Sequence, residues 1–206
     1  YGDGAIYAIR RFNLSEMPES CFFYACGLGY HSLYLNGNRI APDNWMTPPF
    51  TSYHKRCCYT AHPALQKLLH IGKHVLGMVI APGGRRNEGE YLKATGGREI
   101  PFMGRPRFTA VLELFGENGK HARICTDEKW ESTRGAIVQT NIFQGETYDA
   151  RNEIPHWCTS EMAYGTGCRL AEPPAKAYAM ELQKLEPVQI GERYRAQAIT
   201  MPEQGR

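Results

Sequence analysis

The sequence lacks several features that would assign it to a common functional class. It has no run of about 18 apolar residues that could span a membrane, and its first residues show no charged-then-apolar signal pattern. Its 24 basic and 21 acidic side chains give a net charge of +3 and are spread along the chain, without the dense basic stripe of a nucleic-acid-binding protein. We therefore expect neither a membrane nor a nucleic acid as a partner.

Disulfide and metal patterns are also missing. The seven cysteines are an odd number without framework spacing, so we expect most of them to be small buried side chains with free thiols. Free thiols favour a reducing compartment, here the cytoplasm. The seven histidines show no H-x-x-x-H or comparable spacing, and the adjacent Cys57 and Cys58 would point to opposite faces of a strand. The sequence predicts no metal site and no cofactor.

Helical periodicity is scarce, because 21 glycines and 13 prolines divide the chain into short runs. Residues 31–35 alternate polar and apolar side chains, which is typical of a half-buried strand, and Asn36-Gly37 then predicts a type I′ hairpin turn. Further strands are expected over residues 5–12, 21–26, 38–40, 75–80, 108–115, 121–125, from Trp130, over 137–143 and from 147, with one helix of about two turns over 61–70. Eight or more short strands at regular spacing indicate a β-sandwich or barrel.

The chain divides into two parts that differ in composition and in expected strand content. Residues 1–160 hold the expected strands, apart from a long glycine-rich and charged loop over 82–104. Residues 161–206 contain a linker-like Ala-Glu-Pro-Pro-Ala stretch and one more expected strand over 180–190. We expect 1–160 to be one β-sandwich module and 161–206 to be a linker with the first strand of a following β-domain.

Five short motifs make the sequence more specific. The run GLGYHSLYLNG at residues 27–37 resembles the GLGxxxLYxNG hairpin of the N-terminal region of bacterial α-L-rhamnosidases. PPFTSYHKR at 48–56 is similar to that family's proline loop followed by TxYxKR, and TDEKW at 126–130 to its TDxxW. QGETYDAR at 144–151 resembles its DGExYDAR, and Pro155-His156-Trp157 stands where the family has a closing tryptophan. The resemblance covers residues 5–157 in order.

This resemblance implies a fold and a role. The fold would be all-β, a jelly-roll or galactose-binding-like β-sandwich with one short helix, followed in the family by a second β-domain and an (α/α)6 barrel. That barrel carries the catalytic acid and base of the inverting glycoside hydrolase, and it has no counterpart in this chain. The resemblance therefore implies a non-catalytic accessory domain that packs against and supports the catalytic part, with the downstream domains of the same polypeptide as partners.

The resemblance also implies an alternative, because in some members this module binds rhamnose with calcium. The chain would then be a calcium-assisted, L-rhamnose-binding, lectin-like module whose partners are rhamnose-containing glycans. Three departures from the family pattern speak against it. Residues 81–86 replace the aromatic GxGWYxG signature, Ser52 replaces a common acid, and Gln144 replaces an aspartate. Sugar sites use an aromatic face with fixed polar groups, and calcium needs six to eight oxygens, several of them carboxylate.

The candidate carbohydrate-binding residues share an oxygen-bearing or aromatic side chain within the motifs or the proline-rich loop. Trp45 is the leading candidate, because an exposed indole beside Asp43 and Asn44 is a plausible sugar contact, although a loop tryptophan folded back onto the sandwich fits equally. The full candidate set is Asp43, Asn44, Trp45, Tyr53, Glu146 and Asp149, and the residues expected to serve the fold are Asn36, Gly37, Trp130, Tyr148 and Arg151. A structural network of Glu146, Tyr148, Asp149 and Arg151 is favoured over ligand contact.

Independent catalysis would need two carboxyl groups about 5 to 9 Å apart across a cleft. The candidate pairs are Glu88 with Glu90, Asp127 with Glu128, and Glu146 with Asp149. Neighbours and residues three apart on a strand point to opposite faces, which disfavours the last two pairs, and the first lies in a charged loop. We expect no catalytic residue in this chain.

Overall fold

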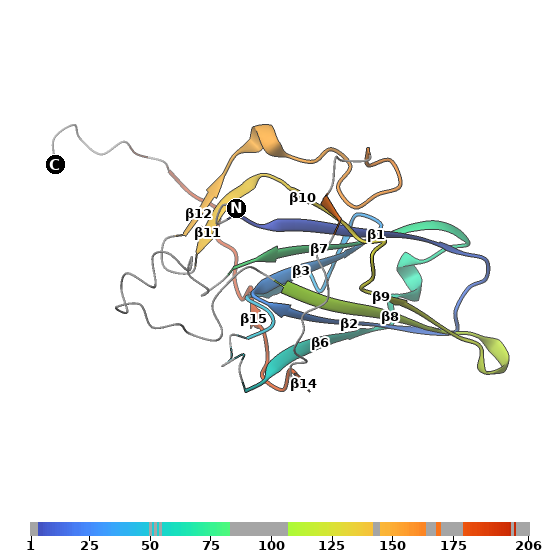
Figure 1. Cartoon of the computed structure of the whole chain (residues 1–206). Helices are drawn as coiled ribbons and strands as arrows, with labels where there is room; N and C mark the ends of the chain where they lie inside the picture. Colours follow the sequence, from blue (N-terminus) through green and yellow to red (C-terminus); the bar gives the residue numbers. More distant parts are fainter. Residues whose placement is uncertain are drawn as a thin grey trace.

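Two sheets packed face to face hold most of the strands in the computed structural model, which describes residues 4–49, 51, 53, 55–82, 107–141, 145–163, 168–169, 179–198 and 200 (Figure 1). The first sheet runs in the order β13 (Cys168–Arg169), β10 (Glu131–Arg134), β1 (Ile6–Leu14), β7 (Gly72–Ala81), β3 (Tyr30–Leu35) and β4 (Asn38–Ile40). The second runs β14 (Met180–Leu182), β6 (Cys57–Pro63), β2 (Ser20–Leu28), β8 (Arg107–Phe115) and β9 (His121–Cys125). The expected all-β sandwich is confirmed.

Smaller elements complete the description. β11 (Ile137–Asn141) pairs with β12 (Gly145–Tyr148), and β5 (Asn44–Trp45) pairs with β15 (Val188–Gln189). The helical elements of the described residues are three short 3-10 turns: η1 (Leu65–Leu68), η2 (Glu117–Gly119) and η3 (Ala150–Asn152). No helix in this part of the chain is long and apolar enough to cross a membrane.

The core lies between the two sheets and follows the period-two pattern of the strands. On β3, His31, Leu33 and Leu35 are buried while the residues between them are partly exposed. Phe23 of the opposite sheet and Trp130 are fully buried in the same core. Since burying one such side chain is worth about 1.5–3 kcal/mol, this alternation fixes which face of each strand points inward.

A second apolar layer covers the outer face of the first sheet. Trp157 and Cys158 pack over Val75, so β7 is buried on both faces along most of its length. The approach is close at Gly77, where a Cβ atom would lie 2.5 Å from the sulfur of Cys158. The segment after the last motif is therefore bound to the sandwich by packing.

The sequence expectations for the strands are confirmed to within a few residues, and so is the hairpin. Asn36 and Gly37 have φ values of 51° and 80°, as a type I′ turn requires. Beyond the backbone, the Asn36 amide donates to the carbonyl of Leu68 at 2.7 Å, and its oxygen accepts from the amide of Val75 at 3.1 Å. The turn residue thus connects three segments of the module.

The expected helix over residues 61–70 is wrong. Residues up to Pro63 continue strand β6, which pairs with β2 in the register of Phe22 with Pro63, and only the 3-10 turn η1 follows. Leu65 and Leu69 are buried in the core from this turn. Their helix-like spacing therefore reflects core packing beside a 3-10 turn and not an α-helix. Pairing with a neighbouring strand outweighs the weak helical preference of a short segment that contains a proline.

The expected strand over residues 180–190 is divided in two. β14 pairs in parallel with β6 at the edge of the second sheet, and β15 pairs with β5. Pro187, which has no N–H to donate, stands between them. The expected loop over 82–104 and the linker-like stretch over 171–175 lie almost wholly outside the described residues.

Candidate functional site

Trp45 lies on β5 and is 45 % exposed, as a sugar platform would require. The guanidinium of Arg39 lies over the ring at 4.6 Å from its centroid and donates to the carbonyl of Asn44 at 2.9 Å. Such a cation–π contact is worth about 0.5–1 kcal/mol at an exposed site. One face of the indole is therefore already occupied by this protein's own side chain.

The polar groups beside Trp45 are also engaged, by the segment that contains β15. The side-chain oxygen of Asn44 accepts from the amide of Gln189 at 3.2 Å, and the carboxylate of Asp43 pairs with Arg193 at 3.5 Å. In register, Val188 lies opposite Trp45. A sugar that approached this loop would compete with the chain's own residues for the oxygen atoms of Asp43 and Asn44.

Tyr53 is buried, with 2 % of its surface exposed, and packs with Cys26, Leu28 and Cys57. Its side chain packs against residues of the second sheet and is almost fully covered, so it presents no open face to a sugar. The structure does not bring Tyr53 to the surface that carries Trp45.

Glu146 and Asp149 lie elsewhere, on β12 and just after it. Asp149 accepts from the backbone amide of Arg151 at 3.1 Å and from its guanidinium at 2.9 and 2.7 Å. These bonds, led by the guanidinium, hold the pKa of Asp149 below its usual value. The hydroxyl of Tyr148 donates to Glu153 at 2.7 Å. The contacts resemble the predicted network at the end of the hairpin, with Glu146 exposed beside it.

Trp130 has the structural position expected for the TDxxW motif. Its side chain is fully buried, its ring packs edge-to-face with Phe108, and its N–H donates to the carbonyl of Cys125 at 3.0 Å. Asp127 of the same motif is paired with Arg10 at 3.1 Å rather than with a second carboxylate. The carboxylates of Glu88 and Glu90 lie outside the described residues.

The six cysteines whose side chains are described are free thiols, and four of them are buried: Cys21, Cys26, Cys57 and Cys158. Burial raises the pKa of Cys26 and of Cys158 to about 12, which keeps both in the thiol form. Among the described residues, no group of three or more His, Cys, Asp or Glu side chains is placed to hold a metal ion. The calcium-assisted alternative gains no support from these residues.

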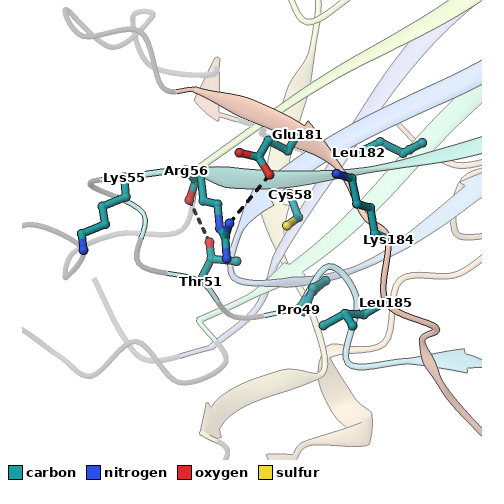
Figure 2. A pocket seen from close by; sticks show the side chains of 9 residues that line it. All are labelled: Pro49, Thr51, Lys55, Arg56, Cys58, Glu181, Leu182, Lys184 and Leu185. Carbon is teal, nitrogen blue, oxygen red and sulfur yellow. Dashed lines mark hydrogen bonds and ion pairs between the residues drawn. The ribbon is translucent and has the colours of Figure 1, made fainter.

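A surface hollow of about 620 Å³ was not predicted from the sequence (Figure 2). It lies between the loop before β6 and strand β14, and it is lined by Pro49, Thr51, Lys55, Arg56, Cys58, Glu181, Leu182, Lys184 and Leu185. The two walls are more than 120 positions apart in the sequence, so no local pattern could have joined them. Only the parallel pairing of β14 with β6 brings them together.

His31 is a second group that sequence reasoning missed. Its ring is buried in the sandwich, and both ring nitrogens lack a hydrogen-bond partner among the described residues. Burial, with a smaller contribution from nearby His62, lowers its pKa to about 3. The void beside it, about 10 Å³, is too small for a sugar. The alternation of residues 31–35 already placed this histidine on the face of Leu33 and Leu35, so the sequence did contain the clue.

Comparison with known proteins agrees with this architecture. Residues 16–192 match the family model described as the α-L-rhamnosidase N-terminal domain. Among curated proteins, an α-L-rhamnosidase of Formosa agariphila is 29 % identical over 165 residues, which is 77 % of this chain and 16 % of the relative. An α-L-rhamnosidase of Streptomyces avermitilis is 33 % identical over 135 residues, or 65 % of this chain and 12 % of the relative.

Solved structures give the same result. The α-L-rhamnosidase of Streptomyces avermitilis, complexed with L-rhamnose, matches with a TM-score of 0.78 and 26 % identity over 93 % of this chain and 18 % of its own. That of Dictyoglumus thermophilum matches with a TM-score of 0.70 and 30 % identity over 85 % of this chain and 19 % of its own. The chain thus spans less than a fifth of these relatives, and it corresponds to their N-terminal domain and not to a catalytic barrel. It belongs to the family of α-L-rhamnosidase N-terminal domains.

Proposed function

We propose that this chain is a non-catalytic accessory domain that packs against and supports the catalytic part of an α-L-rhamnosidase. The observation that carries the proposal is the family match over residues 16–192, together with rhamnosidases of which this chain matches only 12–16 % of the length. The described residues build a sandwich core and contain no α-helix, so they form no part of an (α/α)6 barrel of the kind expected to carry the catalytic residues. What a domain of this kind can contribute is binding surface and stability.

The lectin-like alternative is weaker for a specific reason. Its best platform, Trp45, has one face under Arg39, and its polar neighbours Asp43 and Asn44 are bound by Arg193 and Gln189. Tyr53 is enclosed, and Glu146 lies on a separate hairpin. Sugar sites need several convergent polar groups around an open apolar face, and these residues do not converge.

The test is a domain exchange in the Streptomyces avermitilis enzyme. Three proteins are compared: the intact enzyme, a version without its matching N-terminal segment, and a chimera in which this chain replaces that segment. We expect the deletion to lower the Tm by at least about 5 °C and the chimera to recover at least half of the loss, since one kcal/mol shifts Tm by about 2–4 °C in domains of 150–250 residues.

A parallel titration separates the two functions. Calorimetry of the isolated chain with L-rhamnose at millimolar concentration, with and without calcium, should give no binding heat. A chimera no more stable than the deletion would refute the accessory role. Saturable heat that disappears on chelation of calcium would instead establish the lectin-like module.

A further inference from the structure

The exposed apolar side chains of this domain are unevenly distributed. Eleven large apolar side chains are exposed in the described part of the chain; two of them are Trp45 and Met46, and five are Met180, Leu182, Leu185, Val188 and Tyr194. Seven therefore belong to residues 44–46, which contain β5, and to the segment 180–194, which pairs with β5 and with β6. Scattered apolar residues are normal on a protein surface, whereas a concentration of them marks a contact surface.

The segment that carries these residues is held in place by backbone pairing. Cys57 donates its amide to the carbonyl of Ala179 at 2.7 Å, and Gln183 donates to the carbonyl of Tyr59 at 2.8 Å. These bonds fix one wall of the 620 Å³ hollow against β6. Leu182 and Leu185 line that wall although they are 46 % and 71 % exposed. The apolar wall is thus positioned by the fold but left uncovered.

The hollow is also positively charged. Among the described residues that line it, three side chains are cationic, Lys55, Arg56 and Lys184, and one is a carboxylate, Glu181. Arg56 and Glu181 form an exposed ion pair at 3.9 Å, and the two lysines have no ion pair among the described residues. In Figure 2 the Glu181 side chain turns toward Arg56 while Lys55 extends away from the pair. Two positive charges beside an apolar wall are complementary to a segment that is both acidic and apolar.

The chemistry of the lining favours a polypeptide over a sugar. None of the described side chains that line the hollow is aromatic, whereas pyranose rings are normally bound against aromatic faces. Contacts between domains of one chain typically combine apolar residues with a polar, charged rim, which is the composition found here.

We propose that this hollow and its apolar wall are the docking surface for the rest of an α-L-rhamnosidase polypeptide, and that the docking segment carries at least one carboxylate beside apolar side chains. This inference rests on the proposed function and names the surface through which it acts. The apolar wall supplies the contact area, and the lysines select the acidic segment and fix its orientation.

The same chimera tests the surface with matched variants. The hollow variant combines Lys55→Glu with Lys184→Glu, and the control combines Lys67→Glu with Lys73→Glu, two exposed lysines that do not line the hollow. In the isolated chain both variants should keep the circular dichroism and Tm of the unmodified protein. In the chimera only the hollow variant should lose most of the recovered Tm, and adding salt should weaken the unmodified chimera toward it.

A second hollow variant, Leu182→Ser with Leu185→Ser, should also lose most of the recovered Tm. Each outcome decides a different point. If the unmodified chimera is stabilised and both hollow variants are as stable as it is, the domain docks through another surface; the inference fails and the accessory role stands. If the unmodified chimera is no more stable than the deletion, both fail. Saturable binding of D-galacturonate to the isolated chain, lost in the Lys55 and Lys184 variant, would make the hollow an anionic sugar site and overturn the inference.

Discussion

His31 makes the stability of the sandwich depend on pH in a calculable way. A histidine in an unfolded chain has a pKa near 6.5, whereas burial lowers the pKa of His31 in the folded protein to about 3. Between these values the unfolded chain binds a proton that the folded chain excludes. Stability is therefore complete well above pH 6.5 and is lost as the pH falls through 6.5 toward 3.

The magnitude follows from the two pKa values. At pH 5 the unfolded imidazole is about 97 % protonated and the folded one about 1 %, which corresponds to about 2 kcal/mol of lost stability relative to pH 8. This loss depends almost entirely on the unfolded pKa, so any folded value below about 4 gives nearly the same result. For a domain whose total stability is about 5–15 kcal/mol, the loss is easily measured.

The experiment compares urea unfolding at pH 8 and pH 5 for the unmodified chain and for His31→Gln, followed by far-ultraviolet circular dichroism. Burial also lowers the pKa values of His62 and His74, but both remain in both proteins, so their contribution cancels in the difference. The drop in unfolding free energy from pH 8 to pH 5 should be about 2 kcal/mol smaller in the variant. Ser32→Ala, a neighbour without a titrating group, should show the full drop. Equal drops in His31→Gln and the unmodified chain would show that His31 takes up its proton without opening the core.

Two further predictions concern close contacts. Asn36→Gly keeps the left-handed turn but removes the side-chain hydrogen bonds to Leu68 and Val75, so it should lower the unfolding free energy by about 2–4 kcal/mol. The control, Asn38→Ala, should lower the unfolding free energy by no more than about 1 kcal/mol. Equal losses in the two variants would contradict the structural role of the Asn36 side chain. Gly77→Ala forces a Cβ against Cys158 and should cost about 1–3 kcal/mol. In urea unfolding Cys158→Ala should relieve about half of that cost or more, and strictly additive losses would rule out the contact.

The sequence predicted those parts of the fold that depend on local pattern. The alternation around Leu33 set the inward face of β3, and Asn36-Gly37 set its turn, because both effects act within a few residues. The helix expected over 61–70 failed because residues 59–63 pair with β2, which is distant in sequence. A local preference worth a fraction of a kcal/mol per residue does not survive that competition.

The candidate site was predictable only in part, for the same physical reason. Exposure of Trp45 could be inferred from its proline-rich loop, but its contact with Val188 joins positions 143 residues apart. The burial of Tyr53 depends equally on Cys26 of another strand. A motif identifies which residues matter to a family, whereas burial and pairing, which decide what each residue can touch, are settled by the tertiary fold.

The segment around β14 and β15 bears both on sugar binding at Trp45 and on docking at the hollow. It covers the oxygen atoms beside Trp45 through Gln189 and Arg193, and it also forms the apolar wall of the hollow through Leu182 and Leu185. Freeing the tryptophan loop for a sugar would require displacing β15, which begins three residues after Leu185 of that wall. A tail held in place favours docking and opposes sugar binding at Trp45. Trp45 is therefore held by the chain's own side chains, while Leu182 and Leu185 of the wall stay exposed.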